Sequence, residues 1–266
     1  MTERSPRILH VLDHSLPMQS GYTFRTRAIL KAQEAMGFAV RSITGLRHTA
    51  SGPSPEEADG LVFDRVTGVV QGPAGIREWQ EIKRFAQGIE SLAREWRPDI
   101  LHAHSPALCG AAALRVGRRL GIPVVYEIRA FWEDAAVGNG TGEEGSLKYR
   151  LTRALENRVV RGANAVVTIC EGLRADLAAR GTPPEKITVM PNGVDLALFG
   201  APAARDAALA RSLGFETADG APCPVIGFIG SFYDYEGLDD LIAAMPALLE
   251  RQRDARLLLV GGGPRA

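Results

Sequence analysis

Cysteines and long apolar runs are scarce in this sequence. Its 266 residues include three cysteines, Cys109, Cys170 and Cys223, and no CxxC pair, so neither a disulfide framework nor a zinc knuckle is indicated. No stretch approaches the roughly 18 consecutive apolar residues of a membrane span. The opening MTERSPRILHVL lacks the apolar core of a secretory signal. We therefore expect a reduced, globular protein of the cytoplasm, with peripheral contact at the inner membrane face left open.

An excess of charge of either sign is lacking too. Lysine and arginine total 31, and aspartate and glutamate total 31, whereas a protein that binds nucleic acid electrostatically normally has a basic excess. We expect no nucleic-acid partner. The sequence also lacks a P-loop, a GxSxG nucleophile motif and an HExxH motif. Its apolar fraction of 45% is enough for a substantial core.

Strand-like and helix-like segments alternate along the first 190 residues. Strands are predicted at residues 7–12, 39–44, 61–66, 99–104, 123–128, 165–169 and 186–190, with helices between them. This alternation is typical of an α/β protein with a parallel sheet covered on both faces. The pattern breaks down at residues 131–145. The GxGxxG there follows no strand, so it does not indicate a dinucleotide site.

Two predicted helices have an apolar stripe that we expect to face the core. In the helix after Gly21 the stripe consists of Phe24, Ala28, Ala32, Ala35 and Met36. In the helix at residues 75–96 it consists of Ile76, Trp79, Ile82, Ile89 and Leu92.

The pattern changes after PNGVD at residues 191–195. An alanine- and proline-rich stretch follows, and then a single strand–helix–strand unit at residues 225–260. One such unit cannot bury a two-sided parallel sheet. We predict a first domain at 1–195, a linker at 196–222 and an incomplete second domain at 223–266. The alternative is that the last unit extends the first sheet.

Candidate functional residues follow the predicted strands, where ligands of open α/β sheets bind. Gly21, at a strand–helix junction, is suited to a phosphate or is an ordinary loop glycine. His102 and His104 share one face of a strand, either as hydrogen-bonding core residues or as a metal pair that lacks a third ligand. Cys170 begins a helix without a histidine or asparagine partner, so we expect a buried, unreactive residue.

The stretch Glu127-Ile-Arg129-Ala-Phe-Trp132-Glu-Asp134 brings carboxylates, an arginine and an aromatic ring together at a strand end. An arginine fork suits a phosphate or carboxylate, and an aromatic face suits a sugar ring. The alternative is a mutual Glu–Arg ion pair beside a core tryptophan.

The helix at residues 146–161 is rich in cations. Lys148, Arg150, Arg153, Arg158 and Arg161 alternate with Leu147, Leu151 and Leu155. This pattern fits either contact with anionic lipid or a solvated helix face.

Several segments, in order, resemble the family-4 retaining glycosyltransferases of the GT-B fold. They are RILHVLDHSLPMQSGYTFR, RPDILHAHSP, NAVVTICEGLRADLAARGTPPEKITVMPNGVD, IGFIGSFYDYEGLDDLIAA and LLLVGGGP. Within that family, YEIRAFWED and GSFYDYEGLD are similar to transferases associated with exosortase systems and bacterial exopolysaccharide assembly.

The resemblance implies two Rossmann-like domains, the first binding a glycan or lipid-linked acceptor and the second a nucleotide-sugar donor. It implies sugar transfer with retention of configuration, no metal, and no cofactor besides the donor substrate. By position, the implied catalytic residues are Arg129, Glu127 and His104. The implied donor-binding residues are Gly21, Tyr22, Gly230, Ser231, Gly261 and Gly262.

This chain departs from the family pattern in three ways. Ser231 and Glu236 replace two basic residues that many relatives place at the donor diphosphate, and Arg129 replaces a common histidine. The paired glutamates of the later donor domain are missing, so we expect a chain truncated within that domain. The alternatives are a non-catalytic half-protein that binds acceptor or membrane and recruits a donor-binding chain, and a sugar-nucleotide epimerase.

Overall fold

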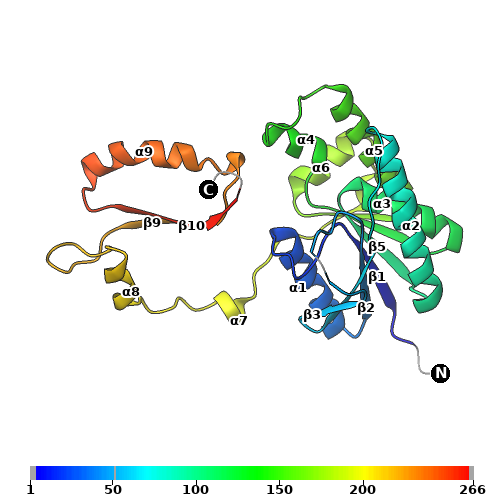
Figure 1. The fold of residues 1–266 in the computed structure, drawn as a ribbon, viewed down its shortest axis with the longest axis horizontal. Helices are drawn as coiled ribbons and strands as arrows, with labels where there is room; N and C mark the ends of the chain where they lie inside the picture. Colours follow the sequence, from blue (N-terminus) through cyan, green and yellow to red (C-terminus); the bar gives the residue numbers. More distant parts are fainter. Residues whose placement is uncertain (1–3, 51, 264–266) are drawn as a thin grey trace. The chain divides into compact units, whose positions relative to one another are not determined.

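The computed structural model describes residues 4–50 and 52–263. The chain divides into two compact units (Figure 1). The larger unit holds the chain up to Ala135 together with Glu144–Asn192, and the smaller unit holds Ala136–Glu143 and the chain from Gly193 onwards. No helix among the described residues is long and apolar enough to cross a membrane.

The larger unit is built on an eight-stranded sheet with the order β3-β4-β2-β1-β5-β6-β7-β8. Its strands are β1 Arg7–Leu12, β2 Ala39–Thr44, β3 Glu56–Ala58, β4 Leu61–Arg65, β5 Ile100–His104, β6 Val124–Ile128, β7 Ala165–Thr168 and β8 Ile187–Val189. All neighbouring strands are parallel except β3 and β4. The predicted α/β class and the seven predicted strands of this sheet are confirmed. The edge strand β3, which sequence analysis missed, pairs through a tight turn at Asp59 and Gly60, both with positive φ.

Helices cover both faces of this sheet. They are α1 Gly21–Ala35, α2 Ile76–Trp96, α3 Ala107–Leu120, α4 Trp132–Gly138, α5 Leu147–Gly162 and α6 Glu171–Ala179. The helices α2, α3 and α5 pack side by side (Figure 1) over the main apolar core, which includes Leu9, Val11 and Ala103. Because side chains alternate along a strand, residues such as Leu12 point to the other face, where they meet Leu30 of α1.

The predicted orientation of α1 is wrong. Phe24 is 52% exposed and Met36 is 66% exposed, so the apolar stripe points away from the sheet. Thr23 and Thr26 are buried instead. The buried side of α1 packs partly on polar groups, where Oγ1 of Thr26 accepts from Arg129, and partly on an apolar cluster that Leu30 joins. Two threonines and one leucine therefore take the inner positions that the apolar stripe was expected to fill. For α2, the prediction that the apolar stripe faces the core is confirmed at Ile89. It is wrong in the first turn of the helix, where Ile76 and Trp79 are exposed.

The breakdown of pattern at residues 131–145 is only partly correct, because α4 forms at its start. This seven-residue helix spans about two turns, which is too short for an apolar period to be readable.

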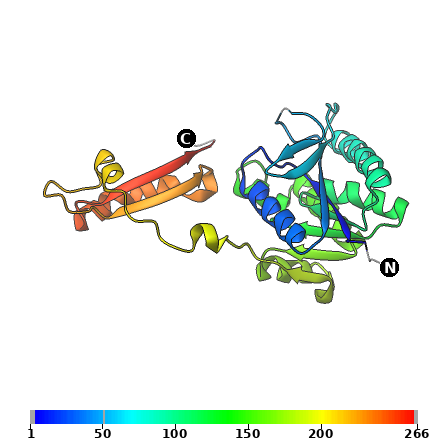
Figure 2. The same ribbon diagram turned by 90° about the horizontal axis from the view of Figure 1, so that it is seen from below.

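The smaller unit pairs β9 Val225–Ser231 with β10 Arg256–Gly262 in parallel (Figure 2). The connecting helix α9, Leu238–Arg251, lies along one face of this pair (Figure 1). These elements confirm the predicted strand–helix–strand unit, which forms its own two-stranded sheet and does not extend the first one. Along the sequence, two short helices come after β8 and before β9: α7 Leu196–Phe199 and α8 Ala207–Ser212.

Candidate functional site

Glu127, at the end of β6, is the centre of a polar cluster beneath α1. Its side chain is fully buried, and Oε1 accepts hydrogen bonds of 2.9 Å from Nε of Arg25 and from Nε of Arg129. Oε2 lies 3.2 Å from Nε2 of His102. Burial by itself would raise the pKa of Glu127, but His104, His102 and Arg129 lower that pKa well below its usual range. The carboxylate is therefore ionised and neutralised by two guanidinium groups.

Arg129 is held by donated hydrogen bonds within the larger unit. Besides the bond to Glu127, Nη1 donates to the carbonyl oxygen of Tyr22 at 2.7 Å, and Nη2 donates to Oγ1 of Thr26 at 3.0 Å and to Nδ1 of His104 at 2.6 Å. The guanidinium also stacks 4.3 Å from the centre of the Tyr22 ring. Four of its five N–H groups thus have partners in the protein, an arrangement that suits positioning of the site better than direct binding of a diphosphate.

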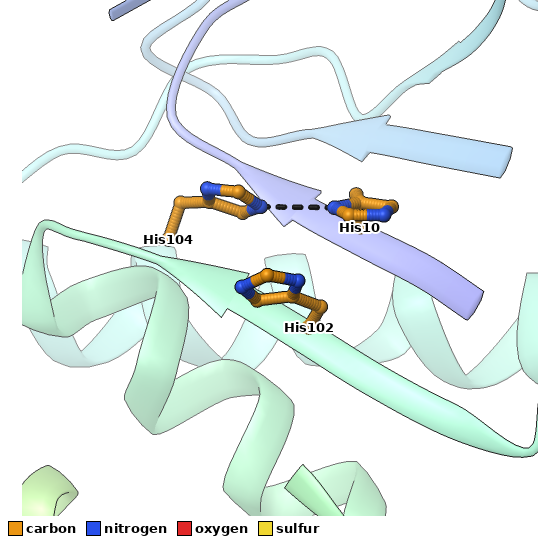
Figure 3. Close-up of side chains that lie close together, drawn as sticks. All are labelled: His10, His102 and His104. Carbon is orange, nitrogen blue, oxygen red and sulfur yellow. Dashed lines mark hydrogen bonds between the residues drawn. The ribbon is translucent and has the colours of Figure 1, made fainter. Parts of the chain in front are cut away.

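Three histidines from neighbouring strands lie together beside this arginine (Figure 3). Nε2 of His104 lies 2.9 Å from Nδ1 of His10, and Nε2 of His10 lies 2.8 Å from Oε1 of Gln33 on α1. An arginine can only donate, so Nδ1 of His104 accepts and its proton is on Nε2. That proton is donated to His10, which in turn donates to Gln33.

His10 and His104, the two histidines of this series of hydrogen bonds, are neutral. Burial and the neighbouring His102 lower the pKa of His10 to about 3. The same causes lower the pKa of His104 well below its ordinary value. At neutral pH each hydrogen bond in the series from Arg129 to Gln33 therefore has one fixed donor and one fixed acceptor.

The ring nitrogens of His10, His102 and His104 lie within 4.8 Å of one another, a spacing that suits a metal ion. His10 is the third ligand that sequence analysis did not find, because its closeness depends on the pairing of β1 with β5, which sets His10 opposite His102. A metal on Nε2 of His104 would, however, move the proton to Nδ1, which faces a donor N–H of Arg129. The donor set therefore favours the hydrogen-bond chain.

Arg25, which sequence analysis also missed, links Glu127 to the start of the PNGVD segment. Its Nη2 donates to the carbonyl oxygen of Met190 at 2.7 Å. Its Nη1 donates to the carbonyl oxygen of Pro191 and to Oδ1 of Asn192, both at 3.0 Å. A polar stripe on α1 could have predicted that Arg25 belongs to the site. The stripe consists of side chains that recur at helical spacing: Tyr22, Arg25, Thr26 and Gln33.

Two of the expected donor-binding residues, Gly21 and Tyr22, lie in the first turn of α1. Gly21 begins the helix, is exposed, and has no atom within 4 Å of the position a Cβ would take. The hydroxyl of Tyr22 accepts from the backbone N–H of Asp13 at 3.1 Å. The structure thus brings Tyr22, His104, Glu127 and Arg129 into one cluster, with Gly21 at its edge.

The other four expected donor-binding residues belong to the smaller unit, where strand pairing brings them together. Gly261 is opposite Gly230, and Gly262 is opposite Ser231. Gly261 has φ +152, and a Cβ there would lie 1.8 Å from the carbonyl oxygen of Gly230. Only glycine fits this position, and the four backbones remain exposed at the strand ends.

Two further expectations need correction. Trp132 is 39% exposed and is not a core residue; Phe131 is buried instead, with the guanidinium of Arg180 3.8 Å from its ring centre. Cys170 is exposed, because it precedes α6 as its N-cap residue and does not lie on the inner side of that helix.

Comparisons with known proteins agree with this architecture. Residues 20–193 match the family described as "Glycosyl transferase 4-like domain", and residues 223–266 match "Glycosyl transferases group 1". Among solved structures, sucrose-phosphate synthase from Thermosynechococcus elongatus has a TM-score of 0.71 at 19% identity, covering 97% of this chain and 63% of that one. Anabaena HepE in complex with UDP and glucose has a TM-score of 0.66 at 17% identity, covering 98% and 62%.

The fold is thus the α/β, Rossmann-like GT-B fold of glycosyltransferases. The chain belongs to the glycosyltransferase 4-like family. D-inositol 3-phosphate glycosyltransferase from Segniliparus rotundus is 31% identical over 85% of this chain and 49% of its own length. GDP-mannose-dependent alpha-mannosyltransferase from Mycolicibacterium smegmatis is 26% identical over 97% of this chain and 63% of its own length. The chain spans about half to two thirds of the length of these curated relatives.

Proposed function

We propose that this protein takes part in moving a sugar from a nucleotide-sugar donor to a glycan or lipid-linked acceptor, with retention of configuration, in cell-surface polysaccharide assembly. The match of residues 20–193 to a glycosyltransferase family carries this proposal. The solved complexes of HepE with UDP and glucose and with UDP-glucose support a nucleotide-sugar donor. The segments GSFYDYEGLD and YEIRAFWED motivate the polysaccharide setting, including the exosortase association.

In the proposed reaction, the bond between the anomeric carbon and the donor diphosphate breaks. A bond from that carbon to an acceptor oxygen forms on the same face, and the acceptor proton goes to the departing phosphate oxygen. In this proposal the exposed strand ends at Gly230, Ser231, Gly261 and Gly262 are assigned to the donor diphosphate and nucleoside. We assign the exposed first turn of α1, at Gly21, to the diphosphate as well.

The polar cluster beneath α1 has a positioning role in this proposal. Glu127 and His104 fix the guanidinium of Arg129, which in turn holds the carbonyl oxygen of Tyr22 in the first turn of α1. The geometry of that turn therefore depends on buried charges beneath it. We propose that neither a metal nor a cofactor besides the donor is needed.

We place the domain boundary at the PNGVD segment, with an acceptor-side domain at 1–195, a linker at 196–222 and donor-domain residues at 223–266. We also place the protein in the cytoplasm, in peripheral contact with the inner membrane face, where a lipid-linked acceptor would be found.

The test is a panel of UDP-, GDP- and ADP-sugars incubated with the protein, with and without a lipid extract as acceptor, followed by release of nucleoside diphosphate. Release that depends on both donor and acceptor supports the proposal. Conversion of a donor without acceptor would instead indicate an epimerase, a class present among the structural neighbours. Binding of acceptor lipid without turnover, and turnover restored by a second chain, would indicate the non-catalytic half-protein.

A further inference from the structure

The outer face of α5 combines cations and apolar side chains that no other part of the larger unit covers. Its exposed side chains are Leu147, Lys148, Arg150, Leu151, Ala154, Arg158 and Arg161. Leu147 is 71% exposed and Leu151 is 61% exposed. At helical spacing these residues lie on one side of the helix. We call this set the α5 face.

The inner side of α5 is fixed by close packing, so the α5 face keeps its outward orientation. Val159 and Val160 are buried in the main core, and α5 packs against α3 (Figure 1). A Cβ on Gly110 of α3 would lie 2.4 Å from Cγ1 of Val159, so a side chain larger than hydrogen would push the two helices apart. The glycine is what allows this close approach.

The cations of this face have no counter-ion in the part of the chain that the structure describes. Among the described residues, Lys148, Arg150, Arg158 and Arg161 form no ion pair, and the acid of this helix, Glu156, is buried. Most arginines elsewhere in the larger unit have an acidic partner. Exposed cations without partners repel one another, so this arrangement has a cost for the folded protein.

Helix stability does not explain the arrangement either. The first turn of α5 has no acidic residue, although a helix N-terminus favours negative charge and disfavours cations such as Lys148. The two exposed leucines of α5, Leu147 and Leu151, lie in the same part of the helix as these cations. Their exposure favours a surface that accepts apolar side chains and positive charge together.

We propose that the α5 face binds the surface of an anionic bilayer, with Leu147 and Leu151 inserted among the headgroups and the cations against lipid phosphates. Charge complementarity selects this partner over a neutral membrane, and the exposed leucines select a lipid surface over a polyanion such as nucleic acid. The inference deepens the proposed function by naming the partner surface, and it rests on that function only for its biological setting.

The test is flotation of the protein with two kinds of vesicle, phosphatidylcholine alone and equal parts phosphatidylcholine and phosphatidylglycerol. We expect binding to the anionic vesicles that weakens with added salt. Arg150→Gln combined with Arg158→Gln is expected to weaken it about twenty-five-fold, since each cation near an anionic surface contributes roughly fivefold. Leu147→Ala combined with Leu151→Ala is expected to weaken it about tenfold.

The matched control is Arg251→Gln combined with Arg253→Gln, which removes the same charge from exposed positions of the smaller unit and should leave binding unchanged. Thermal melting of each variant checks that the fold is retained. Equal binding to both vesicles, an equal loss in the control, or tighter binding to DNA than to anionic vesicles at the same salt would overturn the proposal. Because no sugar transfer is measured, failure here is distinct from failure of the proposed function.

Discussion

Glu127 shows how one buried charge can organise the side chains around it. One carboxylate accepts from Arg25 and from Arg129, and the second arginine then orders His104 and His10 through a single direction of hydrogen bonding. Removing the charge would leave two nearly buried guanidinium groups without compensation, which is far more costly than losing a surface ion pair.

The first prediction is that Glu127→Gln lowers the free energy of unfolding by about 3 kcal/mol, as expected when one partner of a buried ion pair is removed. Chemical denaturation measures this. Glu34→Gln, which breaks a 3.8 Å pair with Lys31 on the exposed side of α1, is the control and should change little. Equal stability of the two variants would show that the cluster around Glu127 does not hold the larger unit together.

Glu156 gives a second prediction, for pH dependence. Its side chain is fully buried, and burial raises its pKa from 4.5 to about 7. The folded state therefore holds a proton that the unfolded state releases above pH 4.5. The stability contributed by this protonated form is complete below pH 4.5 and is lost progressively as the pH rises to 7.

Glu156→Gln, which cannot ionise, should therefore gain about 3 kcal/mol relative to the wild type between pH 4.5 and pH 8. Urea denaturation at both pH values measures the difference. His10 and His104, whose lowered pKa values act in the opposite direction, occur in both proteins and cancel. A difference that does not change with pH would contradict this account of Glu156.

At the scale of elements, helices approach one another closely where the sequence supplies glycine. Gly110 on α3 is the clearest case, because a Cβ there would meet Val159 on α5 at 2.4 Å and the Tyr126 ring on β6 at 2.9 Å. We predict that Gly110→Ala destabilises the protein by about 1–3 kcal/mol through overpacking. Thermal or chemical denaturation measures this.

The matched control is Gly172→Ala in α6, where the nearest atom to a Cβ is Sγ of Cys170 at 3.8 Å. There the better helix propensity of alanine should stabilise the protein by about 0.5–1 kcal/mol. The same substitution in two helices thus has opposite expected signs. If both variants were stabilised, the tight α3–α5 contact would not exist.

The elements also show what sequence can and cannot predict here. Every strand except β3 is readable because the apolar runs are short and bounded by turns, as at residues 100–104 and 165–168, whereas β3, Glu56–Ala58, has no apolar run. The orientation of α1 is not, because Phe24 and Met36 form an apolar stripe that lies outside while Thr23 and Thr26 lie inside. Periodicity identifies a two-sided helix, but the polarity of the sheet beneath decides which side is buried.

The residues of the candidate site also fall into two groups, those that the sequence predicts and those that depend on the fold. Tyr22, His104, Glu127 and Arg129 could be proposed from the sequence because they lie at or after the ends of strands that are readable there. Their partners His10, Arg25 and Gln33 were missed, because each depends on which strands are neighbours and how α1 is rotated.

At the scale of the whole molecule, Arg25 holds the beginning of the PNGVD segment against the rest of the larger unit. Arg25 reaches Glu127 with one edge and Met190, Pro191 and Asn192 with the other. A lysine keeps the charge but offers one point of contact in place of a planar fork. We therefore expect Arg25→Lys to loosen this segment while the core of the sheet stays intact.

Hydrogen exchange measures this prediction. The amide of Met190, which donates to Thr168, should exchange about ten- to hundredfold faster in Arg25→Lys, because loss of one charge-assisted hydrogen bond is worth about 1.5–3 kcal/mol. Arg27→Lys, on the same helix and paired with the exposed Asp59, is the control and should leave that amide unchanged. Faster exchange throughout β6 and β7 would instead indicate a general loss of stability.

The proposed transfer of sugar with retention is tested most directly by ¹H NMR of the product formed from a reactive nucleotide sugar and an acceptor lipid. The account predicts a new glycoside whose anomeric configuration is the same as that of the donor, and which forms only when acceptor is present. An inverted product, free sugar alone, or an isomerised donor formed without acceptor would contradict it.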